Sequence, residues 1–356
     1  MGAAQFTIDA SLQDLLSTKQ IGPGDLRELT ALVQGDSVVD WTQLFFRSLP
    51  QVNEFLRVAA YDPDNGLDME RLAEIHREAV RYIRSTLSIE VPPVLAHPHR
   101  LQNVFMYASS KNRFRRQACM LLKVMHVINH LEARELLYHL PTSEHELFQR
   151  IDRRVSRVVS DMFQLGFPIE EYLPSRKTKE SLITKLLSKR KSTAAQVFDR
   201  IRFRIITRTR ADILPILFYL KRHLVPFTLV VPGESTNTLE SVHDLIGHGF
   251  GVDNFESPDP RHRPAFNRFS HRDFRVISFV CDVPLRVEDL IRRAEVPLLT
   301  RFGHVVLIPT EFQIFDRETY EANETGPASH ALYKERQIRE VVRRLYTGVH
   351  EGLDED

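Results

Sequence analysis

The spacing of apolar residues changes near residue 166, and this change divides the chain into two kinds of predicted structure. Before it, apolar residues recur three and four positions apart, which is typical of helices that bury one face. Helices are predicted over residues 9–20, 24–35, 67–87, 115–140 and 145–166, and the last of them has Thr142 or Ser143 with Glu146 as a capping box. The stretch 88–102 contains three prolines and is predicted to be a connector.

After residue 166, short apolar runs alternate with helical patterns. Strands are predicted over residues 200–208, 226–232, 274–284 and 304–315, and helices over 211–224 and 329–349. The predicted fold class is α+β. A helical N-terminal domain would occupy residues 1–140, a mixed sheet flanked by helices residues 141–350, and an acidic tail residues 351–356.

Charge is balanced over the whole chain but not along it. The 48 basic and 47 acidic residues give a net charge of +1, so the composition contains no general signal for a polyanionic partner. Basic residues gather instead in 111–116, 153–157 and 176–191. A solvated helix face is the simpler interpretation of the first two clusters.

Two features indicate a cytoplasmic protein that makes no membrane contact. The cysteines, Cys119 and Cys281, stand far apart and cannot form a disulfide framework or a zinc cluster, which favours a reducing compartment. No apolar run approaches the 18 residues that a transmembrane helix needs.

Three separate segments carry candidate phosphate chemistry. Lys177, Ser181 and Lys185 are four residues apart, so on one helix they would share a face suited to a polyphosphate. The strand predicted to follow begins near Asp199 and alternates arginines, among them Arg204, with apolar residues.

The third segment is the apolar strand 304–315. It presents Glu311 and Gln313 on one side because successive strand residues alternate between faces. Carboxylates on two strands, Asp199 and Glu311, would form a Mg²⁺ site, since Mg²⁺ takes one or two carboxylates together with substrate phosphates.

Taken in order, these segments resemble the synthetase domain of the RelA/SpoT-type (p)ppGpp synthetases, which has a nucleotidyltransferase-like fold. That family carries Arg-x-Lys-x-x-x-Ser-x-x-x-Lys, then Asp with Arg five residues on, then Glu-x-Gln-Ile, and finally a Gly-x-Ala-x-His-x-x-Tyr-Lys tail. The leading Arg of the first motif is replaced by Ser175 here, with Arg176 one position off. The tail corresponds here to Gly326, Ala328, His330, Tyr333 and Lys334. The resemblance covers roughly residues 145–345, about half the chain.

The resemblance implies Mg²⁺-dependent transfer of pyrophosphate from ATP to the 3′-hydroxyl of a nucleotide or of an RNA. Asp199 and Glu311 would hold the metal, and with Gln313 they would form the catalytic group. The implied donor-binding residues are Lys177, Ser181, Lys185, Arg204 and His330.

The chain departs from the family on the acceptor side. Residues 231–241 lack the Lys and Tyr of the family's Lys-Asp-Tyr-Ile, and only Phe269 or Phe274 replaces its guanine-stacking Tyr, out of register. The acceptor is therefore expected to differ from a free guanine nucleotide. A catalytically silent nucleotide-binding regulatory module is the alternative.

A second alternative is a two-His-one-carboxylate iron enzyme. His243 and His248 lie five residues apart, and Glu288 follows downstream as a third candidate ligand. Five residues turn a straight helix through about 500°, which separates the two imidazoles in angle. Histidines at the surface of a helix that stops near Gly247 or Gly249 are the simpler interpretation.

Overall fold

The computed structural model describes residue 29 and residues 44–188, 201–239, 271–294 and 301–350 of the chain. Its first part is helical: α3 (Leu49–Val58), α4 (Gly66–Ser85), α5 (Pro93–Ala96), α6 (Gln102–Ser109), α7 (Arg115–His139) and α8 (Glu144–Gln164). These helices confirm the predictions for 67–87, 115–140 and 145–166. The predicted helices 9–20 and 24–35 lie outside the described residues.

Local signals in the sequence set both ends of α8. The Ser143 hydroxyl accepts a hydrogen bond from the Glu146 amide at 3.1 Å, so Ser143 is the N-cap. At the other end Gly166 has φ +78°, a left-handed conformation that costs glycine little, and the Phe167 amide donates to the Met162 carbonyl. The chain then turns into the first strand.

The second part contains one five-stranded mixed sheet in the order β1-β2-β5-β4-β3. Its strands are β1 (Ile169–Arg176), β2 (Ile201–Thr207), β3 (Thr236–Asn237), β4 (Ile277–Arg286) and β5 (Val305–Asp316). Strands β2 and β5 run parallel, and the other neighbouring pairs are antiparallel. The helices of this part are α9 (Lys179–Ser188), α10 (Ile213–His223), α12 (Glu288–Ala294), α13 (Arg317–Thr325) and α14 (His330–His350).

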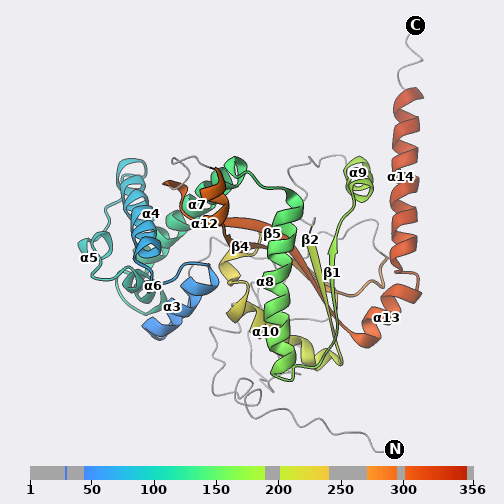
Figure 1. Ribbon diagram of the computed structural model, residues 1–356, viewed down its shortest axis with the longest axis horizontal. Coiled ribbons are helices and arrows are strands. Elements are labelled where there is room, and N and C mark those ends of the chain that lie inside the picture. The colour runs from blue at the N-terminus through green and yellow to red at the C-terminus, as the bar shows by residue number, and fades with distance from the viewer. Residues whose placement is uncertain (1–28, 30–43, 189–200, 240–270, 295–300, 351–356) are drawn as a thin grey trace, which may run out of the picture.

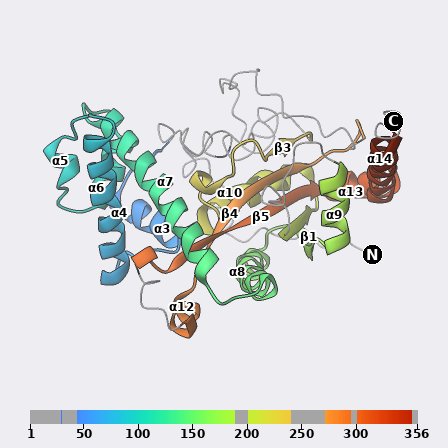
Figure 2. The same cartoon turned by 90° about the horizontal axis from the view of Figure 1, so that it is seen from above.

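This arrangement confirms the predicted fold class, a helical region followed by a mixed sheet flanked by helices (Figure 1). Helices α3 to α7 gather at one end of the sheet, and α9, α13 and α14 lie near the other end (Figures 1 and 2). In the described part of the chain no helix is long and apolar enough to cross a membrane.

One predicted strand is absent, and one strand of the sheet was not predicted. Residues 226–232 do not form a strand, because Phe227–Leu229 make a 3₁₀ turn and only Val230 forms a bridge, to Cys281. Conversely, β1 was not predicted, because an edge strand alternates weakly between buried and exposed positions and here contains Pro174.

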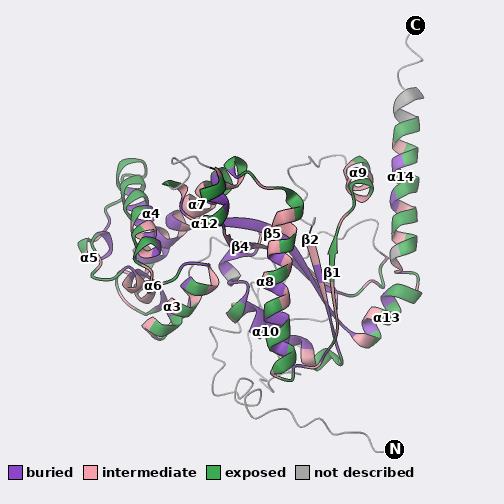
Figure 3. Cartoon of the chain, in the orientation of Figure 1, coloured by how far each residue is buried: buried purple, intermediate pink, exposed green. Residues whose placement is uncertain are grey.

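One face of the sheet belongs to the main hydrophobic core. A row of aromatic rings crosses it, with Tyr172, Phe203, Phe312 and Phe279 spaced at centroid distances of 5.9, 5.6 and 5.5 Å. Buried side chains of α8 and α10 complete this core, and α8 is seen along one side of the sheet in Figure 2. Figure 3 shows how fully the central strands are buried compared with the outer faces of the helices.

A second hydrophobic cluster joins α3, α4, α6 and α7 and reaches Val305 of β5. At the boundary between the two clusters, Arg286 at the end of β4 forms a bidentate ion pair with the buried Asp68 of α4, at 2.5 and 3.2 Å. Arg286 also donates to the Ala60 carbonyl. Removing Arg286 would leave the buried Asp68 charge without its counter-ion, so breaking this contact is costly.

Further along the same boundary, α7 packs titratable side chains against β4. The rings of His126 and His130 are 4.2 Å apart, and His130 Nδ1 lies 3.6 Å from the Asp282 carboxylate. Burial raises the pKa of Asp282 to about 6, although the nearby Arg134 guanidinium opposes this. Burial also lowers the pKa of His130 to about 4, so this imidazole is neutral at the pH values where Asp282 titrates.

The raised pKa of Asp282 predicts a pH-dependent effect of Asp282→Asn on stability. Folded Asp282 keeps a proton that the unfolded chain loses above pH of about 4, so its contribution to the free energy of unfolding falls as pH rises to about 6. The variant lacks this loss. Its free energy of unfolding should match that of the parent protein near pH 4. Above pH 6.5 it should be higher than that of the parent by on the order of 2–3 kcal/mol, as measured by urea unfolding at each pH.

The exposed Gln164→Ala on α8, which removes no titratable group, serves as the control, and its difference from the parent protein in free energy of unfolding should not change with pH in this range. Parallel pH profiles for the parent protein and Asp282→Asn would contradict the buried, protonated state of Asp282.

Candidate functional site

The face of the sheet opposite the aromatic row carries a row of polar side chains. In the parallel pairing of β2 with β5, Arg202 lies beside Glu311 and Arg204 beside Gln313. Strand alternation turns these four side chains to one face and Phe203 and Phe312 to the other. The register thus brings two cations, a carboxylate and an amide together from segments more than 100 residues apart.

Glu311 is the centre of this row and is 7% exposed. Its Oε2 accepts a hydrogen bond from Arg202 Nε at 2.8 Å. Its Oε1 accepts from Gln313 Nε2 at 2.7 Å and from the Ser278 hydroxyl of β4 at 3.1 Å. A carboxylate has about four lone-pair sites, so these three donors leave about one for a ligand.

The row continues from Gln313 to the C-terminal end of α13. Gln313 Oε1 accepts from Arg204 Nε at 3.1 Å, and Arg204 Nη1 lies 3.7 Å from a Glu324 carboxylate oxygen on α13. Two arginines and two carboxylates therefore balance in charge along this face. An anionic ligand would need further cations from outside the row to be held strongly.

The structure corrects the predicted basic helix. Lys177, Ser181 and Lys185 do not share one helical face, because residues 169–176 pair with β2 as strand β1 and α9 begins only at Lys179. Lys177 thus lies in the connection directly after β1. Ser181 and Lys185 lie on α9, where Thr178 forms hydrogen bonds with both the amide and the hydroxyl of Ser181.

Several predicted site residues cannot be placed. Asp199 lies outside the described residues, as do His243 and His248. His330 begins α14, but its side chain is not described. Within the same tail, the Tyr333 hydroxyl accepts from Gln337 Nε2 at 2.8 Å, one turn along α14.

The carboxylate proposed as a third iron ligand already has a partner. Glu288 accepts from Arg286 Nε at 3.0 Å at the boundary with the helical region. Among the residues that the structure describes, no three His, Cys, Asp or Glu side chains are grouped so that they could hold a metal ion.

Sequence reasoning missed Arg202, Ser278 and Glu324 as members of the site. The alternation Arg202-x-Arg204 was a usable signal, because it matches the alternation Glu311-x-Gln313 on a neighbouring strand. Nothing local marks Ser278 or Glu324, whose positions depend on strand pairing and on the docking of α13.

Comparison with known proteins finds no matching family model and no matching curated sequence. Among solved structures, the chain is similar to small alarmone synthetase 1 from Bacillus subtilis, with 13% identity, coverage of 63% of this chain and 97% of that one, and a TM-score of 0.31. Small alarmone synthetase 2 from the same organism has 18% identity, coverage of 62% of this chain and 98% of that one, and a TM-score of 0.31. A GTP pyrophosphokinase family protein from Streptococcus pneumoniae has 16% identity, coverage of 60% of this chain and 95% of that one, and a TM-score of 0.27.

These similar structures are two alarmone synthetases and a GTP pyrophosphokinase family protein, which is the class of protein that the motifs resemble. At TM-scores near 0.3, however, the backbones superpose poorly.

The buried pair Arg202–Glu311 predicts a strong energetic coupling. Arg202→Met leaves the Glu311 carboxylate buried without its counter-ion and should lower the free energy of unfolding by about 3–5 kcal/mol. Adding Glu311→Gln removes the buried charge and should restore most of that loss, which a double-mutant cycle by urea unfolding would measure.

The exposed pair Arg57–Asp64 provides the control, and Arg57→Met should cost less than about 1 kcal/mol. An Arg202→Met variant no less stable than Arg57→Met would show that the Glu311 charge is not desolvated.

Proposed function

We propose that the chain transfers a pyrophosphate group from ATP to a hydroxyl of a nucleotide or of an RNA 3′ end. The observation that carries this proposal is the parallel register that sets Arg202 and Arg204 against Glu311 and Gln313 on one buried sheet face. Fixed cations beside a fixed carboxylate suit phosphoryl chemistry, in which positioning and electrostatic stabilisation supply most of the catalysis.

In this reaction the acceptor oxygen bonds to the β-phosphorus of ATP as the bond from that phosphorus to the oxygen bridging to the α-phosphate breaks. AMP leaves, and the hydroxyl proton goes to a base. Glu311 is proposed as that base, since its remaining lone pair is held in place by Arg202, Ser278 and Gln313. Gln313 would orient Glu311 and Arg204 at the same time.

The donor phosphates need more positive charge than the balanced row supplies. We propose that Lys177 and Lys185 provide it from outside the row and act together with Arg204 of the row, with Ser181 and His330 as further donor-side contacts. Lys177 follows β1 directly, and Arg204 lies on β2, the strand paired with β1. α9 begins two residues after Lys177 and carries Lys185. The two lysines thus come from consecutive segments at the β1 edge of the sheet.

Mg²⁺ fits the described residues through one carboxylate. It takes one or two carboxylates together with phosphate oxygens and water, and Glu311 has one lone-pair site left for it. Asp199 is proposed as the second ligand. The metal would neutralise charge on the ATP phosphates. Glu311 has one free lone-pair site and would therefore act either as the base or as a ligand of the metal, and the Glu311→Gln variant below distinguishes the two roles.

A catalytically silent nucleotide-binding module is the second candidate. The specific observation that favours it is that three protein donors already occupy Glu311. Both candidates predict ATP binding, and only the first predicts turnover.

Glu311→Gln is expected to abolish pyrophosphate transfer and leave ATP binding largely intact, because the amide keeps the shape of the side chain but accepts no proton. Transfer is measured with γ-labelled ATP and binding by calorimetry in Mg²⁺. Glu318→Gln, an exposed change on α13, is the control and should keep full activity.

Loss of Mg²⁺-dependent ATP binding in Glu311→Gln would instead assign this carboxylate to the metal. ATP binding with no turnover of any acceptor by the parent protein would favour the silent module.

The rewritten acceptor segment, residues 233–273, predicts that GTP is a poor acceptor. This segment carries His243, His248, His262, His271, Arg261, Arg263, Arg268 and Arg272, which suits a bulkier or more anionic acceptor than GDP or GTP. A panel of nucleotides and tRNA offered with labelled ATP should show transfer to another nucleotide or an RNA end. Efficient formation of ppGpp or pppGpp would contradict this expectation.

A further inference from the structure

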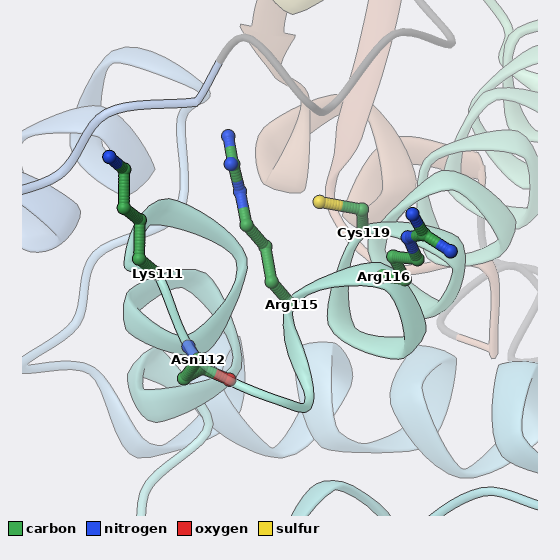
Figure 4. A pocket seen from close by; sticks show the side chains of 5 residues that line it. All are labelled: Lys111, Asn112, Arg115, Arg116 and Cys119. Atoms are coloured by element: carbon green, nitrogen blue, oxygen red, sulfur yellow. The ribbon is translucent and has the colours of Figure 1, made fainter.

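The helical region contains a pocket that the proposed transfer reaction does not use. It has a volume of about 500 Å³ and is lined by Lys111, Asn112, Arg115, Arg116 and Cys119 (Figure 4). These residues come from the loop between α6 and α7 and from the first two turns of α7. The volume lies in the range of small-molecule sites, well above that of a single ion.

The lining of this pocket is strongly cationic. The segment 111–116 contains Lys111, Arg113, Arg115 and Arg116 and no acidic residue. Lys111 and Arg116 are exposed, and neither forms an ion pair with a carboxylate in the part of the chain that the structure describes. Arg113 instead places its guanidinium 4.6 Å from the centre of the Phe114 ring, outside the pocket lining.

The loop that carries these cations is held rigidly. Asn112 Nδ2 donates to the carbonyls of Tyr107 and Ser110 at 2.8 and 3.0 Å, and its Oδ1 accepts from the Phe114 amide at 2.8 Å. Arg115 Nε donates to the Ala108 carbonyl at 3.2 Å. A rigid loop fixes the positions of Lys111 and Arg115 before any ligand arrives, which lowers the entropic cost of binding.

The start of α7 adds to the electrostatic imbalance. Its first turn has no acidic residue and no capping side chain, and it begins with two arginines. Cations near a helix N-terminus are unfavourable, because the first backbone amides already carry partial positive charge. Figure 4 shows the Lys111 and Arg115 side chains extending to the same side of the loop, so an anion there would meet both.

We propose that this pocket binds the di- or triphosphate group of a small molecule. The two exposed cations Lys111 and Arg116 already exceed what one monoanion needs, and the volume leaves room for two or three linked phosphates. The group comes either from inorganic pyrophosphate or polyphosphate, or from the phosphate end of a nucleotide. The site is separate from the polar row on the sheet and does not depend on the proposed transfer activity.

The test uses the full chain, with inorganic pyrophosphate and ATP as probes in calorimetry and in hydrogen exchange. Either probe should slow amide exchange in residues 107–120. Lys111→Gln combined with Arg116→Gln should weaken binding at this site by about tenfold or more, since each change removes a charged hydrogen-bond donor. Both residues are exposed, so the fold should be retained.

Arg153→Gln combined with Arg157→Gln is the matched control. It removes the same charge from exposed positions on α8 and should leave affinity for pyrophosphate unchanged. In Glu311→Gln, either probe should still slow amide exchange in residues 107–120. Loss of the transfer reaction can therefore be told apart from loss of binding at this pocket. Protection by pyrophosphate alone assigns the inorganic source, and protection by ATP alone assigns a nucleotide.

Three results would overturn the proposal: no protection of residues 107–120 by either probe, equal weakening in the control variant, or binding of single-stranded RNA without binding of pyrophosphate or ATP.

Discussion

The structure depends on the burial of two polar side chains in the central strand. Strand β5 has a neighbour on each side, and all of its residues except Pro309 are buried. Glu311 and Gln313 can occupy it only if every lost contact with water is replaced by a protein donor or acceptor. Arg202, Arg204 and Ser278 meet this requirement from the two flanking strands. A register slip of one residue would turn Glu311 into the aromatic row, so this polar pairing also fixes the sheet.

The same pairing constrains the chemistry of the site. The three donors that compensate the burial of the Glu311 carboxylate also occupy most of its lone pairs, so the carboxylate is held in one orientation and has about one site left for a ligand. Such a site is preorganised for one ligand geometry but can accept few additional ligand contacts. The cations that a polyphosphate requires must therefore come from the β1–α9 segment beside the row.

A second set of buried polar contacts joins the helical region to the far end of the sheet. Asp68 pairs with Arg286, and His130 of α7 faces Asp282 of β4. Helix α7 starts at the cationic pocket and reaches this boundary about four turns later. The pocket lies beside the second hydrophobic cluster, whereas the polar row lies on the sheet whose other face the main core covers, and helix α7 contributes residues to both clusters.

The sequence by itself determined the elements whose signal is local. Helices α7 and α8 follow from three-four periodicity and from the Ser143 cap, and β2 and β5 from short apolar runs carrying Arg-x-Arg and Glu-x-Gln. Only the tertiary structure decided that Arg202 would face Glu311, that Ser278 would join it, and that residues 169–176 would form β1 and separate Lys177 from α9. Helix periodicity and capping act within a few residues, whereas sheet neighbours and register are set by contacts between segments distant in the chain.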